Sequence, residues 1–198
     1  MAFRRGQGLQ GTADDVAFST LEKGMPYALL PHAAMLPKSV SSVHCAIRRD
    51  GDALRLTYAV AASQGALRLP ESASPLRTDG LWQTTCFELF VADEGGAYRE
   101  FNFAPSGQWA AYSFTARREG MEPLEMREPP AIRLAEQAGE TILSVTLPGM
   151  STGPLRLGIT AVIEETDGTK SYWALRHGGN APDFHDPDCF VAQLPPAD

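Results

Sequence analysis

The fold of this chain is decided by two short runs of sequence, TCFELFV at residues 85–91 and YREFNF at residues 98–103. Both runs are rich in aromatic and other apolar residues and have the length of a strand. The turn residues DEGG at 93–96 separate them. Two such runs around an acidic and glycine-rich turn predict an antiparallel hairpin.

The length of the turn sets which side chains share a face of this hairpin. A three-residue loop pairs Asp93 with Ala97 and therefore brings Glu88 opposite Asn102. Because side chains alternate between the two faces of a strand, Glu100 then lies on the same face as Glu88 and Asn102. A two-residue turn would shift the register by one residue and separate the two carboxylates.

Similar runs recur along the rest of the chain. Two alternating runs between about residues 40 and 60 flank the Asp50-Gly51 turn and predict a second hairpin. Further strands are predicted at 84–92, 97–103, 108–114, 140–147, 155–165, 170–177 and 189–194. Nine or ten strands without a long helix predict an all-β fold, an antiparallel β-sandwich of jelly-roll type.

Length and composition agree with one turn-rich domain. The chain has 198 residues, of which 43% are apolar, with 18 Gly and 15 Pro. This is enough to form a single core. Residues 1–24 are polar and Gly-rich and are predicted to be an N-terminal extension, disordered in part and with at most one short helix at 13–23. Residues 25–198 are predicted to form the domain.

The charge pattern excludes some kinds of partner. The formal net charge is −7, and the few basic pairs are isolated, so no surface suits a nucleic acid. No apolar run approaches the roughly 20 residues that cross a membrane, and the first residues lack the apolar segment of a secretory signal. Cys45, Cys86 and Cys189 are odd in number and form no metal or redox motif. We therefore expect buried free thiols and a cytoplasmic protein.

Two carboxylates and an amide on one sheet face allow three interpretations. They can form hydrogen bonds with the hydroxyls of a sugar or another polyol. They can also be the acid and base of a glycosidase, since diagonal neighbours on adjacent strands lie at a suitable separation. Finally, they can lie on the solvated face of an outer sheet.

The tryptophans add a second signal. Trp82 follows the polar Asp79-Gly80 turn, where an aromatic ring can stack on the apolar face of a pyranose. Trp109 and Trp173 lie within strand-like runs, where large aromatic side chains commonly fill the core.

Three segments resemble the DOMON-like domain family: DGLWQTTCFELFV at 79–91, YREFNFAPSG at 98–107, and YWAL at 172–175 with PDFHDPD at 182–188. These domains are similar to the family-nine carbohydrate-binding modules and to the DOMON haem or sugar domains. The resemblance extends over about residues 25–194 and implies a jelly-roll sandwich with a ligand pocket on one sheet or at its rim.

The resemblance also implies roles for particular residues. In the sugar-binding modules two tryptophans sandwich a terminal sugar, and a Glu six residues after the first Trp binds its hydroxyls. Trp82 and Glu88 have this spacing, Trp173 is the candidate second wall, and Asn102 the amide partner. The other polar sugar contacts of those modules have no counterpart that we can place.

We therefore predict a non-catalytic domain that binds a saccharide or sugar derivative. Its predicted ligand-binding residues are Trp82, Glu88, Arg99, Glu100, Asn102, Trp173 and His177. Arg99 and His177 are expected to flank the pocket. Some DOMON-like domains are fused to a UDP-N-acetylmuramate reductase, which suggests cell-wall sugars and a partner enzyme of unknown identity.

Two alternatives remain open on the same residues. In haem-binding relatives a Met pairs with His or Lys on the iron, and the available ligands are Met121, Met126, Lys170, His177 and His185. A glycosidase that uses Glu88 and Glu100 is the other alternative. A structural cation is conceivable at Asp183, His185, Asp186 and Asp188, although a turn stabilised by aspartate hydrogen bonds is the favoured explanation of that cluster.

Overall fold

The computed structural model describes residues 24–137 and 139–197, so the predictions for residues 1–23 lie outside the described residues. The described part contains twelve strands and two short 3-10 helices, η1 (Leu81–Gln83) and η2 (Pro187–Cys189). The strands are β1 (Met25–Pro31), β2 (Val40–Asp50), β3 (Ala53–Ala62), β4 (Cys86–Ala92), β5 (Tyr98–Phe103), β6 (Trp109–Phe114), β7 (Glu122–Pro123), β8 (Ala131–Gln137), β9 (Glu140–Leu147), β10 (Leu155–Glu164), β11 (Lys170–Ala174) and β12 (Ala192–Leu194).

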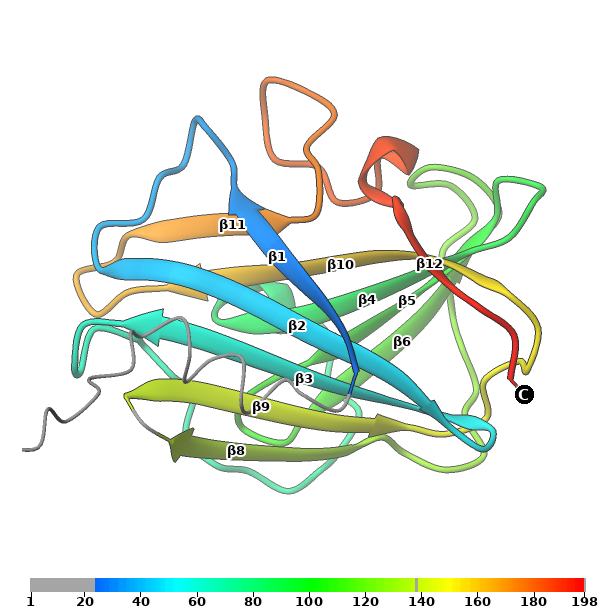
Figure 1. Ribbon diagram of the computed structural model, residues 1–198, viewed down its shortest axis with the longest axis horizontal. Coiled ribbons are helices and arrows are strands. Elements are labelled where there is room, and N and C mark those ends of the chain that lie inside the picture. Colours follow the sequence, from blue (N-terminus) through cyan, green and yellow to red (C-terminus); the bar gives the residue numbers. More distant parts are fainter. Residues whose placement is uncertain (1–23, 138, 198) are drawn as a thin grey trace, which may run out of the picture.

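The strands form two layers that β1 joins. One layer has the order β1-β2-β3-β9-β8, and the other has the order β11-β10-β4-β5-β6-β7, with β12 beside β10. Strand β1 pairs with β2 along Met25–Leu29 and then with β11 at Leu30 and Pro31. All pairings between these strands are antiparallel, and Figure 1 shows the first layer in front of the second. The all-β antiparallel sandwich predicted from the sequence is confirmed.

Three of the twelve strands were not predicted. Strand β1 contains two prolines, and β8 reads AIRLAEQ with most of its side chains exposed. Strand β7 has only two residues. These sequences lack the apolar alternation of the others, and they become strands by pairing at the edges of layers or between them. The nine predicted strands are all present.

The main core lies between the two layers. Its largest buried side chains include Tyr58 from β3, Phe87 from β4 and Phe101 from β5. The Tyr58 hydroxyl donates a hydrogen bond to the backbone carbonyl of Glu88 at 2.9 Å, so this polar atom is satisfied inside the core. The three cysteines are free and buried, as predicted.

The predicted register of the β4-β5 hairpin is confirmed. The Asp93 N–H donates to the Ala97 carbonyl at 3.0 Å, which closes a three-residue loop. Glu88 therefore pairs with Asn102, and Glu100 lies two pairs further along, on the same face. The β2-β3 hairpin also turns where predicted, with Gly51 at a φ of 63° that favours glycine.

A second apolar cluster lies on the outer face of the β4-β5-β6-β10 layer. It includes Phe90, Tyr98 and Phe114 from the sheet, and Phe184 and Phe190 from the segment that follows β11. This segment, residues 175–191, folds back over the sheet, and we call it the covering loop (Figure 1, orange to red). None of the helices in the described residues is long and apolar enough to cross a membrane.

Candidate functional site

A pocket of about 1050 Å³ opens on the outer face of the second layer, beside the covering loop. The sheet contributes its floor, because Glu88, Glu100, Tyr112, Val162 and Tyr172 alternate with side chains that point into the core. The remaining lining residues are Met35, Asp79, Gly80, Trp82, Gln83, Phe114, Arg118, Met121, Pro123, Pro182, Phe184 and His185.

Two carboxyl groups lie in the floor of this pocket. Glu88 is 3% exposed and Glu100 is 6% exposed. Thr160 of β10 donates its hydroxyl to Glu88 Oε2 at 2.9 Å, and the Asn102 amide donates to Glu100 Oε1 at 2.7 Å. The structure therefore brings together the three polar residues that the register placed on one face.

Burial keeps these acids from ionising easily. Desolvation and the nearby charge of Glu100 raise the pKa of Glu88 to about 8, against the opposing hydrogen bond from Thr160. Burial also raises the pKa of Glu100, while the Asn102 hydrogen bond and the charge of Arg118 act in the other direction. The raised pKa of Glu88 therefore favours its neutral carboxylic acid form at pH 7.

His185 connects the floor to the covering loop. The Tyr98 hydroxyl accepts the Arg118 N–H at 3.1 Å, so its own proton is free to be donated to His185 Nδ1 at 2.7 Å. His185 Nε2 then carries the ring proton and faces Glu100 Oε2 at 3.8 Å. Burial, followed by the charges of Arg118 and Arg117, lowers the pKa of His185 to about 4, so the ring is neutral.

Aspartates of the covering loop form ion pairs that hold it in place. Asp183 receives Arg117 Nη2 at 2.7 Å and Arg118 Nη2 at 2.9 Å. Asp186 pairs with Arg117 at 3.0 Å and also caps η2 by accepting the Asp188 N–H. These contacts explain the acidic cluster without a metal.

The predicted cation site is not formed in the described residues. Within residues 24–137 and 139–197, no three His, Cys, Asp or Glu side chains are grouped so that they could hold a metal ion. Of the four candidates, Asp183 and Asp186 face arginines, Asp188 is exposed, and His185 lies in the pocket. The turn interpretation is the one that these contacts support.

Aromatic side chains form the walls of the pocket. Trp82 lies in η1 and is 54% exposed, so its ring is open to a ligand. Gly80 precedes it with a φ of 75°, a left-handed conformation that starts the turn. Tyr112 donates its hydroxyl to Asp79 at 2.5 Å, which fixes the ring on the side of Glu100.

Several of these wall residues were missed by the sequence analysis. Tyr112 pairs directly with Glu100, so its position on β6 follows from the same alternation that placed the carboxylates. Tyr172 reaches the pocket from β11, on the face opposite to Trp173. Phe184 carried no comparable signal, because only the fold of the covering loop brings it to the sheet.

Trp173 does not reach the pocket. Its indole is 2% exposed, packs in the main core between the layers, and donates from Nε1 to Ser171 Oγ at 2.9 Å. Strand alternation points Trp173 inward and its neighbour Tyr172 outward. The prediction of Trp173 as a second stacking wall is therefore corrected. Trp109 also fills the core.

Arg99 and His177 also lie away from this pocket. Arg99 is on the opposite face of β5 from Glu100, with its guanidinium 6.0 Å from the centre of the Phe101 ring. His177 donates to the Leu30 carbonyl at 2.8 Å and packs against His32, with ring centroids 4.8 Å apart. The expectation that Arg99 and His177 flank the carboxylates is therefore wrong for this pocket.

The proposed haem ligands are also scattered. Met121 and His185 both line the pocket. Met126 packs against the main core, and Lys170 donates to the Gln83 carbonyl. His177 lies in the separate hollow beside β1.

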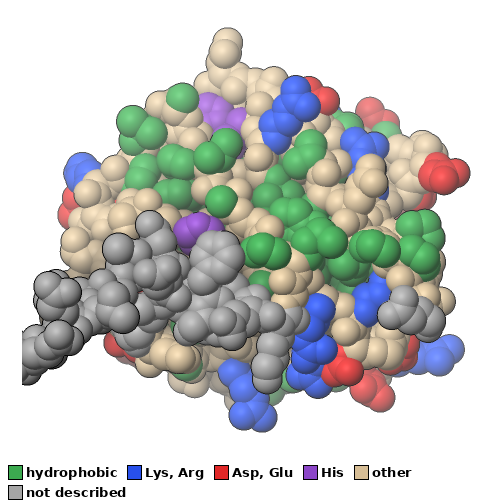
Figure 2. All heavy atoms as spheres, viewed as in Figure 1, with side chains coloured by type: hydrophobic (Ala, Val, Ile, Leu, Met, Phe, Trp, Pro, Cys, Tyr) green, Lys and Arg blue, Asp and Glu red, His purple; other side chains and the backbone are tan. Residues whose placement is uncertain are grey.

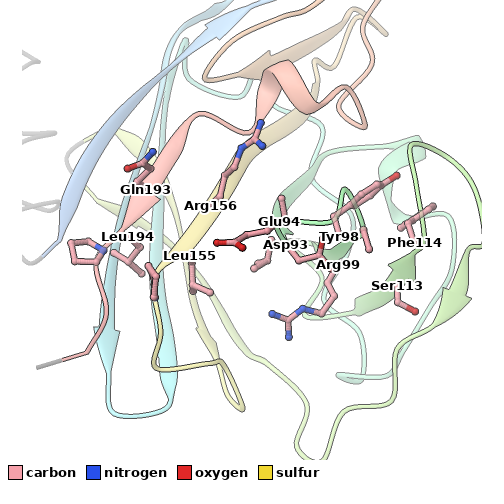
Figure 3. Close-up of a pocket in the computed structure, with 15 residues that line it drawn as sticks. Asp93, Glu94, Tyr98, Arg99, Ser113, Phe114, Leu155, Arg156, Gln193 and Leu194 are labelled. Atoms are coloured by element: carbon pink, nitrogen blue, oxygen red, sulfur yellow. The ribbon is translucent and has the colours of Figure 1, made fainter.

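A second pocket, of about 900 Å³, lies at the other end of the sheet (Figure 3). Leu155, Leu194 and Val91 contribute to its lining, and Arg99, Asp93 and Glu94 provide charge at its edge. Hydrophobic side chains gather right of centre in Figure 2, over the region of β12 that borders this pocket. Its polar side chains do not converge on one buried point, whereas those of the first pocket do.

The fold and the first pocket define a class of protein: a β-sandwich with a pocket of aromatic walls and a carboxylate floor on the outer face of one sheet. No protein-family model matches the sequence, and no curated protein matches it either. The DOMON-like resemblance therefore stays a prediction.

Solved structures of sugar-binding type share this fold. One is a candidate carbohydrate-binding protein from Bacteroides uniformis, with a TM-score of 0.65 and 18% identity over 91% of this chain and 90% of that chain. A family-nine carbohydrate-binding module from Caldicellulosiruptor kristjanssonii in complex with cellotriose has a TM-score of 0.57. Its identity is 9%, and the match covers 96% of this chain and 88% of that chain. A family-nine module from the same organism in complex with glucose has a TM-score of 0.55. Its identity is 6%, and the match covers 96% of this chain and 90% of that chain.

Proposed function

We propose that this protein is a non-catalytic saccharide-binding domain and that its site is the pocket of Trp82, Glu88 and Glu100. The observation that carries the proposal is the exposed Trp82 ring above two buried carboxyl groups. A pyranose presents an apolar face to an aromatic ring and hydroxyls to polar groups at its edge. Buried polar groups that lack full pairing favour a ligand that completes their hydrogen bonds.

Aromatic residues of this pocket stack on the sugar, and its carboxyl groups form hydrogen bonds with the hydroxyls. Trp82 stacks on the sugar from the mouth of the pocket, and Tyr112 and Tyr172 provide the remaining aromatic surface. Glu88 donates as a neutral acid, and Glu100 accepts through Oε2. Asn102 and Thr160 orient these two carboxyl groups from behind. Two carbohydrate-binding modules of similar fold are in complex with cellotriose or glucose. This similarity supports a saccharide as the ligand.

The decisive test is the replacement of Trp82. A panel of gluco- and xylo-oligosaccharides is titrated against the protein, with tryptophan fluorescence and calorimetry as readouts. Trp82→Ala should lower the affinity at least about tenfold without loss of stability, because aromatic anchors dominate such sites. Leu76→Ala is the control, since Leu76 is also an exposed apolar residue but lies outside the pocket.

Two results would overturn this proposal. One is unchanged affinity in a folded Trp82→Ala protein. The other is a panel in which no saccharide binds at all.

The raised pKa of Glu88 favours a second candidate, a glycosidase. A glycoside hydrolase needs one carboxyl group protonated at working pH and a second that is ionised. Turnover of aryl glycosides that disappears in Glu88→Gln would support this candidate, and a broad panel without turnover would remove it.

Met121 and His185 favour a third candidate, haem, since both line the pocket. In the empty site Tyr98 already occupies His185 Nδ1. A saturable one-to-one Soret shift on addition of haemin, lost in Met121→Ala, would support haem. A spectrum that stays that of free haemin would remove it.

A further inference from the structure

The pocket has more acid than the protein itself neutralises. Asp79, Glu88 and Glu100 all line it. Among the described residues, no Lys or Arg nitrogen lies within 4.0 Å of any of these three carboxyl groups, and the nearest ring nitrogen is that of the neutral His185. A neutral sugar can form hydrogen bonds with these acids but brings no positive charge that would stabilise their ionised forms.

The one arginine in the pocket lining is already paired. Arg118 donates to Asp183 from both Nε, at 3.2 Å, and Nη2, at 2.9 Å. Asp183 is a group of the covering loop, so this pair holds the loop in place. Its longer-range charge lowers the pKa of Glu100 but does not overcome the effect of burial.

Both buried carboxyl groups have an oxygen left for a ligand. Glu88 is hydrogen-bonded only through Oε2, to Thr160, and Glu100 only through Oε1, to Asn102. Within the described residues, neither Glu88 Oε1 nor Glu100 Oε2 has a hydrogen-bond partner. The Asn102 amide oxygen, which is buried beside them, is also without a partner in that part of the chain. Glu88 and Glu100 line the pocket, so their second oxygens can each accept a hydrogen bond from a ligand there.

The walls suit a positive charge as well. Trp82, Tyr112, Tyr172 and two phenylalanines surround the acids, and the face of an aromatic ring attracts a cation. Acids below and aromatic rings at the sides are the two features that recognise an ammonium group.

We propose that the ligand of this site is an amino sugar with a free amino group, an inference that rests on the proposed saccharide site. The ammonium of this sugar lies between Glu88, Glu100 and Asp79, while its ring stacks on Trp82. The ammonium supplies a cation that the described residues do not place within 4.0 Å of these acids, and it favours the ionised form of both glutamates. Glu88 then gives up its proton to solvent as the ligand binds, so that one positive and one negative charge appear together in the pocket.

Three tetrasaccharides with the same β-1,4 backbone test this inference, since they differ only at carbon 2. They are the oligomers of glucosamine, N-acetylglucosamine and glucose, with an ammonium, a neutral amide and a hydroxyl there. Calorimetry is done at about pH 6, where an amine of this kind is protonated. We expect the glucosamine oligomer to bind at least about tenfold tighter than the glucose oligomer.

Proton release gives an independent readout. Titrations in two buffers of different ionisation enthalpy should show net release of protons with the glucosamine oligomer and none with the glucose oligomer. Because binding releases a proton, the affinity for the amine should rise between about pH 5 and about pH 7. It should fall again at higher pH, as the free amine loses its charge.

Glu88→Gln separates the charge from the shape of the side chain. It should remove the proton release and most of the preference for the glucosamine oligomer over the glucose oligomer, because glutamine cannot ionise beside the ammonium. Glu136→Gln, on exposed β8, is the control and should leave the affinity for both oligomers unchanged. If Glu88→Gln does not fold, Asp79→Asn serves instead and should lower the preference for the amine.

The outcomes distinguish the two proposals. If the glucose or the N-acetylated oligomer binds as tightly as the glucosamine oligomer, the preference for an amine is wrong and the saccharide site stands. If none of the three binds, and no other saccharide of the wider panel does, the saccharide site fails and the amino-sugar inference fails with it.

Discussion

Glu88 is a carboxylic acid that folding holds in its neutral form. Its pKa is about 8 in the folded protein and near the ordinary value of 4.5 in the unfolded chain. Below pH 4.5 both states are protonated. Between these two values the unfolded chain has lost the proton and the folded protein has kept it, so raising the pH favours unfolding. The stability contributed below pH 4.5 is lost progressively until about pH 8.

We therefore predict that the stability of Glu88→Gln falls less between pH 5 and pH 8 than the stability of the wild type does. The wild type should lose a few kcal/mol more than the variant over this range, since glutamine has no proton to release. Urea unfolding of both proteins at the two pH values measures this. Parallel losses of stability in the two proteins would show that Glu88 is ionised already at pH 5.

The protonation state of Glu88 and Glu100 could not be predicted from the sequence around them. The turn length and the two-residue period were enough to place Glu88, Glu100 and Asn102 together. The interpretation of this face as solvated was nevertheless open, because burial of the acids depends on the covering loop and η1. These segments have no periodic pattern that would reveal where they pack.

At the scale of elements, the covering loop decides whether there is a pocket. Arg156 of β10 donates to the Phe190 carbonyl at 2.8 Å and to the Pro187 carbonyl at 2.9 Å. The Phe190 ring stacks on Phe90 with centroids 5.5 Å apart. This close approach is possible because Gly158 of β10 has no side chain, and a Cβ there would collide with the Phe190 ring.

We predict that Gly158→Ala displaces Phe190 and loosens the covering loop. The cost should be about 1–3 kcal/mol, as for other overpacked sites. Hydrogen exchange should speed up in residues 175–191, while β2, β3 and β9 in the other layer keep their protection. Gly168→Ala is a comparison without a nearby side chain to collide with, although its φ of 86° also strains alanine. Unchanged exchange in the loop of Gly158→Ala would contradict this account.

At the scale of the whole molecule, one core and one shared strand couple the two layers. Side chains of both layers form a single buried cluster, and β1 is hydrogen-bonded to β2 and to β11. Neither layer can therefore expose its inner face while the other remains folded.

We predict a single cooperative unfolding transition. Far-ultraviolet circular dichroism reports the strands, and tryptophan fluorescence reports the buried Trp109 and Trp173 as well as the exposed Trp82. Their urea transitions should coincide in midpoint and slope. Trp82→Ala removes the exposed reporter and should leave the transition in place. Two separated transitions would mean that the layers unfold independently.

Local sequence by itself determined the all-β class, nine strands, both central hairpins and the shared face of Glu88, Glu100 and Asn102. These follow from turn chemistry and side-chain alternation, which act over a few residues. Tertiary structure alone decided that Trp173 lies in the core while Tyr172 faces the pocket, that His177 lies elsewhere, and that Phe184 completes the pocket. These positions, and the neutral state of Glu88, depend on which segments far apart in the chain pack together, because burial is a property of the assembled fold.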